Sequence, residues 1–204
     1  MTIKIRKLDK KDEKSLIDIC FITGDLFLKE VFPDPYLFSL FWCLYYVWYE
    51  TNNSFVAFDT KTKKVIGYIL STLDTKKQEE DFKKTTATLI KNRIKEIKIK
   101  SLKTRIIAHF IINKPTSKKQ RNLLKRYPAH LHINILLEYQ RQGIGHRLMQ
   151  TLESHLINNN VIGYHLEVGA KNNLGINFYK KYGLELVNKN RFTFTFARDL
   201  TCSS

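Results

Sequence analysis

The sequence predicts a mixed α/β fold, with a central sheet of parallel and antiparallel strands flanked by helices. Two observations predict it: segments of period two are interleaved with segments of helical period, and tight turns join several of the expected strands. The chain has 204 residues, 43% of them hydrophobic and 26% charged, which is typical of a globular protein that buries a core. We therefore expect a single domain over residues 1–204.

The first elements are expected to be a strand and two helices. Thr2–Lys7 alternates between polar and apolar residues, and Asp9–Thr23 has apolar residues at helical spacing with acidic residues in its first turn. Tyr36–Tyr49 follows two prolines and is apolar nearly all round, which predicts a helix buried in the core; a lid over a substrate is the alternative. This run is shorter than the roughly 20 residues that cross a bilayer.

Strands and helices are expected to alternate through the rest of the chain, apart from one insertion. In order, they are strands Phe55–Asp59 and Val65–Leu73, joined as a hairpin, strand Ala129–Leu137, helix His146–Leu156, strand Ile162–Val168, helix Asn172–Tyr182, and strands Leu184–Val187 and Arg191–Arg198. Gly183 suits the C-terminal cap of the last helix, and the last two strands are expected to pair antiparallel.

Most of the positive charge lies in residues 76–126, which we interpret as a basic insertion. The chain has 35 basic and 19 acidic residues, a net charge of +16, and this segment holds 17 of the basic and 4 of the acidic residues. Periodicity predicts helices over Thr85–Ile107 and from a cap at Thr116 or Ser117 to Arg126. The charge predicts a polyanionic partner; a solvated insertion without a partner is the alternative.

The cysteines indicate the compartment. Cys20, Cys43 and Cys202 are odd in number and lack CxxC spacing, which disfavours a disulfide framework or a zinc site and is typical of a reducing compartment. The N-terminus lacks the apolar stretch of a signal peptide. We therefore expect a cytoplasmic protein with no metal and no membrane partner.

The strongest functional signal is a glycine turn between a strand and a helix, Gln140–Gly145. Gly143 and Gly145 remove side chains where a ligand must approach the backbone, and the amides of the turn and of the next helix's first residues then face one point. This geometry binds phosphate. The turn fits neither a Walker loop nor a dinucleotide fingerprint, and a purely structural turn is the alternative.

The turn resembles motif A of the Gcn5-related N-acetyltransferase (GNAT) family, which binds the pyrophosphate of acetyl-coenzyme A. The segment from Asn172 through Tyr179 to Gly183 is similar to the family's second hallmark. Two narrower resemblances compete. Pro128–Ile133 resembles the acetyltransferase-like domain of O-GlcNAcase and its free-standing bacterial relatives, whereas Tyr139–Gly145 with Leu166–Asn172 resembles the alanine N-acetyltransferases of ribosomal proteins.

The resemblance implies the GNAT fold, with acetyl-coenzyme A in a wedge between two parting strands. It implies that the acetyl-pantetheine arm meets the backbone of Ile133, Asn134 and Ile135, and that the pyrophosphate lies against Arg141, Gln142, Gly143, Ile144, Gly145 and His146. Asn172 is expected to contact the cofactor or to hold its turn.

Alternation of side chains along two expected strands groups the candidates for the general base. His130, His132 and Asn134 share one face of their strand, and His165 and Glu167 share a face of theirs. Glu167 matches the base position of the ribosomal-protein enzymes and is the first candidate, with His132 second. A structural histidine and an ordinary exposed carboxylate are the alternatives.

Tyr179 is the candidate acid. It lies seven residues after Asn172, on nearly the same helix face, so both residues can address one ligand. By resemblance, Tyr179 protonates the departing thiolate, and its ordinary pKa of about 10 keeps the proton available at neutral pH. Packing of Phe178 and Tyr179 against the sheet is the alternative.

Together these features predict an N-acetyltransferase that moves the acetyl group of acetyl-coenzyme A directly to a primary amine in a ternary complex. The acceptor is an amine-bearing small molecule or protein. The alternative is an acyl-coenzyme A-binding pseudo-acetyltransferase that serves as an interaction module, and a nucleic-acid-associated protein is a more distant one.

Overall fold

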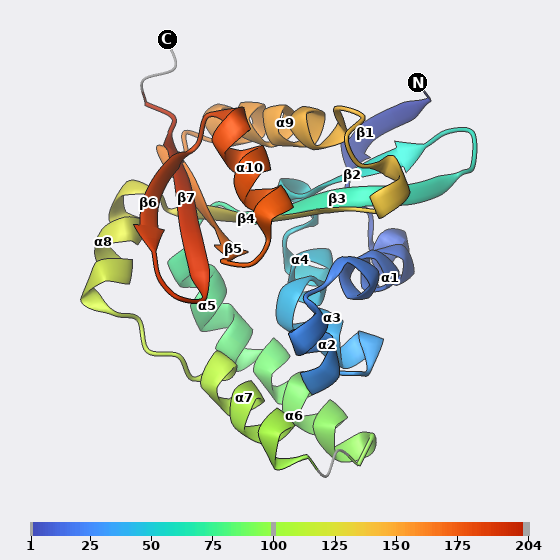
Figure 1. Cartoon of the computed structure of the whole chain (residues 1–204), viewed down its shortest axis with the longest axis vertical. Helices are drawn as coiled ribbons and strands as arrows, with labels where there is room; N and C mark the ends of the chain where they lie inside the picture. Colours follow the sequence, from blue (N-terminus) through green and yellow to red (C-terminus); the bar gives the residue numbers. More distant parts are fainter. Residues whose placement is uncertain (1, 99–100, 202–204) are drawn as a thin grey trace.

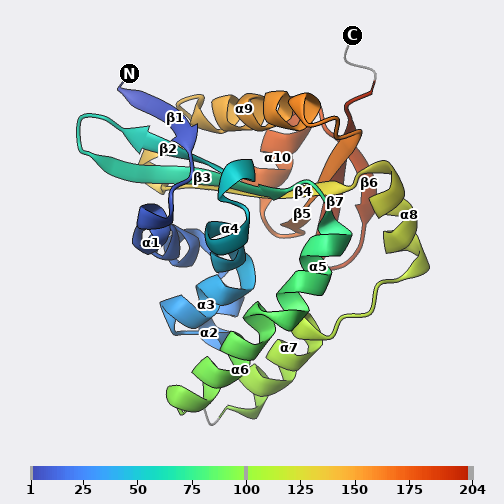
Figure 2. The same cartoon turned by 180° about the vertical axis from the view of Figure 1, so that it is seen from behind.

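A seven-stranded sheet forms the centre of the molecule (Figures 1 and 2). The structure is a computed structural model that describes residues 2–98 and 101–201. The strand order is β1-β2-β3-β4-β5-β7-β6; only β4 and β5 among these neighbours run parallel. The strands are β1 (Ile3–Lys7), β2 (Phe55–Asp59), β3 (Lys64–Thr72), β4 (Ala129–Ile135), β5 (Gly163–Gly169), β6 (Glu185–Lys189) and β7 (Thr193–Asp199). The predicted mixed α/β fold is confirmed.

Helices cover both faces of the sheet, and each face has its own apolar core. Helices α9 (Ile144–Asn158) and α10 (Asn173–Tyr182) lie on one face, whereas α1 (Glu13–Thr23), α3 (Pro35–Trp42) and α4 (Leu44–Tyr49) lie on the other (Figure 1). Alternation along each strand sends neighbouring residues to opposite cores. Leu131 and Tyr164 therefore pack under α9, while Tyr68 and Leu70 pack against α1 and α4.

The N-terminal helices differ from the prediction in three ways. The predicted helix Asp9–Thr23 begins as a 3-10 turn that Asp9 caps, and α1 starts at Glu13. Helix α2 (Leu26–Val31), capped by Asp25, was not predicted because its six residues show too little of the helical period. The aromatic run is buried in the core as predicted, but the backbone at Cys43 leaves the helical conformation and divides the run into α3 and α4.

The insertion is helical, but the predicted helix Thr85–Ile107 is wrong in its bounds. The structure has α5 (Thr75–Lys84), α6 (Thr86–Glu96), α7 (Leu102–Ile112) and α8 (Lys118–Arg126). The side chain of Asp74 caps α5, which begins before the predicted helix, and that of Ser101, inside the predicted helix, caps α7. Ser117 caps α8 as predicted, while residues 99–100 and Cys202 lie outside the described residues.

The insertion is anchored to the rest of the molecule rather than solvated on all sides. Ala87 and Ile90 of α6 and Ala108 and Ile112 of α7 are buried in the core under the sheet. Polar contacts fix the same helices: the Arg93 guanidinium donates to both carboxylate oxygens of Asp34 (3.0 and 2.9 Å), and Thr104 Oγ1 donates to the carbonyl of Val31 (2.7 Å). The insertion therefore extends one of the two cores.

Candidate functional site

Two parallel strands part at the centre of the sheet. The pairing of β4 with β5 covers Ala129 with Tyr164 and His130 with His165, and beyond these residues the strands diverge (Figure 1). The last residues of β4, including the predicted Ile133 and Asn134, thus border an opening whose other side is formed by Glu167 and its neighbours on β5.

The backbone of β4 presents hydrogen-bonding groups to this opening. The amide of Leu136 donates to Ile66 on β3, and groups alternate in direction along an antiparallel ladder, so the N–H and C=O of Ile133 point away from β3. The carbonyl of Ile135 points the same way and accepts from Gln140 Nε2 (2.8 Å). The Asn134 side chain instead faces α1 and donates to Thr23 Oγ1 (2.5 Å). Only backbone groups of Ile133 and Ile135 therefore suit an extended ligand.

The predicted glycine turn ends in an uncapped helix. Gly143 is the N-cap of α9, with φ +77°, and no side chain caps the helix; Arg147 makes the helix's first backbone bond, to Gly143. The amides of Ile144, Gly145 and His146 precede that bond and point out of the helix end. A Cβ at Gly143 would meet nothing within 4 Å, so the space beside Gly143 at the start of the helix is open. The turn has the form of an anion site.

The two glycines of the turn have different roles. A Cβ at Gly145 would lie 3.1 Å from the Phe178 ring, so this glycine allows α9 and α10 to pack closely. Gly145 thus has a packing role, and that both glycines make room for a ligand stays a prediction. Arg141 and Gln142 are exposed in the turn, as is His146, whose ring contacts that of Tyr182 at 5.0 Å between centroids.

His130 is held in a chain of hydrogen bonds. Thr75 Oγ1 donates to the carbonyl of Pro128 (2.6 Å), so it accepts from His130 Nδ1 (3.0 Å). His130 Nε2 is then left to accept from the Tyr46 hydroxyl. Burial lowers the pKa of His130 well below its ordinary value. With both ring nitrogens occupied, His130 is a structural histidine.

His132 lies on the same face as His130 and His165, as predicted, but its ring is not held. It is half-buried, contacts the Tyr46 ring at 5.6 Å between centroids, and makes no hydrogen bond to the described residues. Burial, with a smaller contribution from His165, lowers the pKa of His132 to about 4. The imidazole is therefore neutral at neutral pH and has lone pairs to accept a proton. His165, in contrast, donates from Nδ1 to the carbonyl of Tyr127 (2.9 Å).

Glu167 is exposed at the opening, and its charge acts on a second carboxylate, that of Glu79 on α5 of the insertion. Glu79 is half-buried; burial is the main cause that raises its pKa, and the charge of Glu167 raises it further. Sequence reasoning missed Glu79 because it lies among lysines and acidic neighbours, where it reads as a solvated charge. The signal that could have found it is its spacing of four residues from the buried Thr75.

Tyr179 and Asn172 lie on α10, beside β5. Tyr179 is 8% exposed and packs against Phe178 and Phe196, and its hydroxyl makes no hydrogen bond within the described residues. Burial raises its pKa, which keeps the hydroxyl protonated. Asn172 Oδ1 accepts from the amide of Gly175 (2.9 Å), so its side chain caps α10 and holds the turn.

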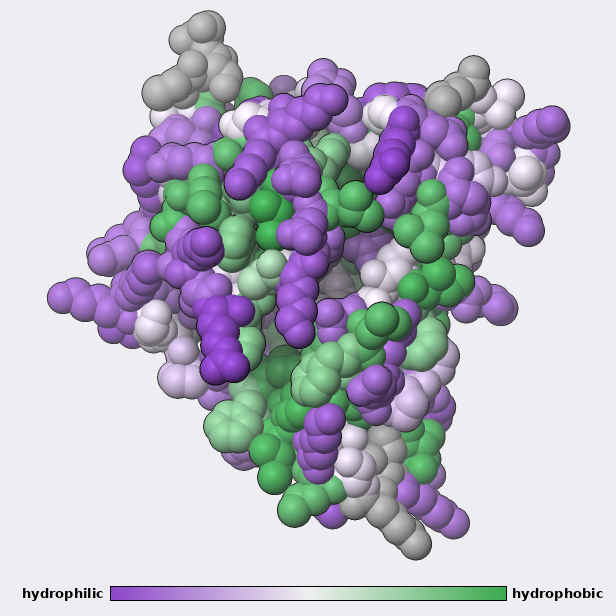
Figure 3. Space-filling view, in the orientation of Figure 1, coloured by the Kyte–Doolittle hydropathy of each residue, from purple (hydrophilic) through white to green (hydrophobic). Residues whose placement is uncertain are grey.

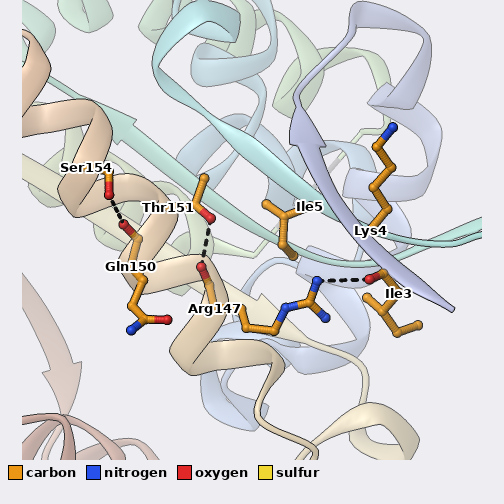
Figure 4. A pocket seen from close by; sticks show the side chains of 7 residues that line it. All are labelled: Ile3, Lys4, Ile5, Arg147, Gln150, Thr151 and Ser154. Carbon is orange, nitrogen blue, oxygen red and sulfur yellow. Dashed lines mark hydrogen bonds between the residues drawn. The ribbon is translucent and has the colours of Figure 1, made fainter. Parts of the chain in front are cut away.

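A separate hollow lies between β1 and α9 (Figure 4). It has a volume of about 510 Å³ and is lined by Ile3, Lys4, Ile5, Arg147, Gln150, Thr151 and Ser154. The hydroxyls of Thr151 and Ser154 donate to carbonyls of their own helix. Arg147 donates to the carbonyl of Ile3 (2.9 Å). These three side chains are therefore engaged with backbone carbonyls.

Comparison with known proteins agrees with this geometry. Residues 118–196 match the acetyltransferase (GNAT) domain family. The match covers 79 of the 204 residues, so this part of the chain is similar to that family. The match spans the glycine turn, both parting strands and α10. The domain and the fold place the chain among the acyltransferase enzymes.

Solved structures are similar to this chain over nearly its whole length. The crystal structure of SsHAT has a TM-score of 0.81 at 25% identity, covering 98% of this chain and 99% of that one. The PaiA N-acetyltransferase of Thermoplasma acidophilum, in complex with coenzyme A, has a TM-score of 0.59 at 16% identity, with coverage of 98% and 99%. An agmatine N-acetyltransferase has a TM-score of 0.61 at 13% identity, with coverage of 98% and 100%. The latter two likenesses show the shared fold.

Two further features are absent from the described parts of the chain. Residues 2–98 and 101–201 contain no group of three or more His, Cys, Asp or Glu side chains that could hold a metal ion. No helix in the same ranges has the length and apolar character to cross a membrane.

The histidine face predicts that acid destabilises the protein. His132 has a pKa of about 4 in the folded chain and 6.5 as its ordinary value, so between these pH values the unfolded chain binds a proton that the folded chain does not. The free energy of unfolding therefore falls as the pH falls from 6.5 to 4, and the share of His132 reaches about 2 kcal/mol at pH 5. Urea unfolding at pH 7 and pH 5 measures it.

His132→Phe should reduce this pH dependence, since phenylalanine keeps a ring and cannot titrate. His109→Phe, at a histidine exposed on α7, is the matched control and should leave the dependence as it is in the wild type. Equal pH dependence in His132→Phe and wild type would contradict the prediction.

The glycine turn predicts that Gly143→Val abolishes binding of acetyl-coenzyme A by a folded protein. Valine would fill the open space at the start of the helix and would be strained at φ +77°. Isothermal titration measures binding, and circular dichroism checks the fold. Gly183→Ala is the control, because Gly183 has a similar φ of +88° but lies at the C-terminal end of α10. This variant should lose stability and keep its affinity for acetyl-coenzyme A. Wild-type affinity in Gly143→Val would remove the turn from the binding site.

Proposed function

We propose that this chain transfers the acetyl group of acetyl-coenzyme A to a primary amine, directly, within a ternary complex. The observation that carries the proposal is the opening between β4 and β5 beside an uncapped helix end with open space at Gly143. The free groups of Ile133 would hold the pantetheine arm as a strand would, and the amides of Ile144, Gly145 and His146 would bind the pyrophosphate. Acetyl-coenzyme A supplies an activated acyl group to this site.

The acceptor amine must lose a proton before its lone pair attacks the thioester carbonyl. Glu167 is our first candidate for the base, because it is exposed at the opening and because the likeness to the ribosomal-protein alanine N-acetyltransferases puts the base there. His132 is the second, because it is neutral at neutral pH and its ring nitrogens are free of hydrogen bonds to described residues. Both lie on the face of the sheet opposite α10.

The departing thiolate needs a proton, and Tyr179 is our candidate to donate it. Its hydroxyl is buried beside β5, unpartnered within the described residues, and protonated at neutral pH. As the new C–N bond forms and the C–S bond breaks, the proton of Tyr179 would pass to sulfur, and a proton of the amide nitrogen would restore the phenol. Tyr179, the acid for the thiolate, lies on one face of the sheet, and Glu167 and His132, the candidate bases for the amine, lie on the other. This arrangement suits two substrates that approach the opening from opposite faces.

Proteins of similar fold indicate which kinds of amine could serve as the acceptor. One neighbour is an agmatine N-acetyltransferase, and another is a complex named for a Gag peptide and coenzyme A, so small amines and peptides both occur among proteins of this fold. We also propose a cytoplasmic location, which the two buried free thiols of Cys20 and Cys43 support.

We further propose a polyanionic partner at a basic face on α8. No residue of this helix is buried, and it carries cations on most of its surface: Lys118, Lys119, Arg121, Lys125 and Arg126. Lys119 Nζ donates to Asn188 Oδ1 on β6 (2.5 Å), so the helix lies against the β6–β7 hairpin, which adds Lys189 and Arg191. Of the cations on α8, Arg126 is paired, with Asp199 at 3.7 Å. The charge supports an electrostatic partner.

Tyr179→Phe tests the transfer reaction. It removes one hydroxyl and keeps the ring, so turnover should fall by on the order of 10²-fold or more while the affinity for acetyl-coenzyme A stays nearly unchanged. A thiol-release assay over a panel of primary amines measures turnover, and isothermal titration measures affinity.

Tyr182→Phe is the matched control, since the Tyr182 hydroxyl lies on the same helix and donates to Glu153 (2.8 Å). This variant should lose stability and keep its turnover. Wild-type turnover in Tyr179→Phe would assign Tyr179 to packing. Binding of acetyl-coenzyme A by the wild type without thiol release from any amine would favour an interaction module over an enzyme.

The basic face predicts salt-dependent binding of a polyanion. With inorganic polyphosphate as the probe, affinity should fall steeply as salt rises, because binding releases counterions from the polyanion. Replacing Lys118, Lys119 and Arg121 by Gln should weaken binding and flatten the salt dependence. The control replaces Lys61, Lys63 and Lys64 by Gln, which removes the same amount of charge from exposed residues around the β2–β3 turn. Affinity that does not change with salt would leave α8 a solvated helix.

A further inference from the structure

We propose that Glu79, which the insertion holds over the acceptor side of the opening, selects an acceptor that carries a second positive charge. Glu79 would bind the distal ammonium of such a diamine, and Glu167 would face the reacting nitrogen. The inference rests on the proposed function. It gives the insertion a role in the acetyltransferase site that is separate from its basic surface.

The start of α5 places Glu79 on the histidine face of the sheet. Thr75, the first residue of α5, donates from both its amide (2.8 Å) and its hydroxyl (2.6 Å) to the carbonyl of Pro128, just before β4. Its hydroxyl also accepts from His130. Glu79 follows one helical turn later, on the same side of α5. It therefore lies near the start of β4, on the face of the sheet that carries Glu167.

The Glu79 side chain is held in place from the far end of the insertion. Gln120 Nε2, on α8, donates to Glu79 Oε1 at 2.9 Å. Glu79 is half-buried, whereas its neighbour Glu80 is exposed. A charged side chain that is partly withdrawn from water and fixed by a neutral donor is preorganised for a ligand, because little conformational freedom is left to lose on binding.

The charges around Glu79 come from three elements. The charge of Glu167 acts on it from β5, Lys83 follows on α5, and Lys114 lies between α7 and α8, with Thr116 beside it. Burial raises the pKa of Glu79 most and Glu167 raises it further, whereas the two lysines lower it and so favour the ionised form. On balance the pKa is raised, so a further cation beside Glu79 would stabilise its ionised form.

The two carboxylates repel each other, and a cation between them relieves the repulsion. His132 lies on the same face and is neutral at neutral pH, so it does not repel a cationic ligand. An ammonium at Glu79 would gain a charge-assisted hydrogen bond in a partly desolvated place, where such bonds are stronger than in water. A monoamine would leave this position without a partner.

Figure 3 shows the molecule from the side seen in Figure 1, with a hollow near its centre and apolar side chains over the lower helices. Exposed apolar residues of α2 and α7 include Leu26, Phe27, Leu102 and Phe110. The charge at Glu79, rather than this apolar surface, is what distinguishes a diamine from a monoamine.

The test compares cadaverine with pentylamine, which differ by one ammonium on the same carbon chain. In isothermal titrations with coenzyme A present, the wild type should bind cadaverine more tightly, and Glu79→Gln should lose that preference by on the order of 10-fold or more. Glutamine keeps the oxygen that accepts from Gln120, so the fold is preserved; equal thermal midpoints would check this. Glu79→Asp, which keeps the charge, should retain part of the preference.

Glu80→Gln is the matched control, since it removes the same charge from the next residue of α5 and should leave the preference intact. Equal affinity of the wild type for the two amines, or a preference that Glu79→Gln leaves unchanged, would overturn the inference. Tight cadaverine binding without thiol release would count against the proposed transfer reaction and leave the role of Glu79 standing.

Discussion

The parting of β4 and β5 is the constraint on which the rest of the structure depends. Two parallel strands that separate after His130 and His165 leave backbone groups without a strand partner in the middle of a sheet. At one end, the Gln140 side chain donates a hydrogen bond to the carbonyl of Ile135. The backbone N–H and C=O of Ile133 have no such partner among the described residues. The open stretch lies beside the uncapped start of α9, so a long ligand can satisfy both at once.

The insertion is continuous with the sheet through one small group of polar contacts. Thr75 hydrogen-bonds α5 to the carbonyl of Pro128, the residue before β4. His130 is hydrogen-bonded both to Thr75 and to Tyr46 of α4, and so connects α5 with α4. Both ring nitrogens of His130 are engaged in these hydrogen bonds, so His130 has a structural role. His132, two residues later on the same face, is the histidine that remains for the opening. The same anchor fixes the direction of α5, and so the position of Glu79.

Much of the fold and part of the site could be predicted from the sequence. Strand alternation placed His130, His132 and Glu167 on one face because a half-buried strand has a period that local residues set. The bounds of the insertion helices could not be predicted, since caps such as Asp74 are recognised only when the next turn is known to be helical. Glu79 was missed for a tertiary reason: its partners Gln120 and Glu167 are 41 and 88 positions away. The role of Gly145 depends on Phe178, which is likewise distant in sequence.

The contact between Arg147 and Ile3 has a consequence for self-association. Strand β1 is at the edge of the sheet, and the carbonyl of Ile3 points outward, where a strand of another molecule could pair with it. The Arg147 guanidinium occupies that acceptor and brings a positive charge to the edge (Figure 4). A second strand would have to displace a charged hydrogen bond before it could extend the sheet, so α9 protects this edge against the pairing that leads to aggregation.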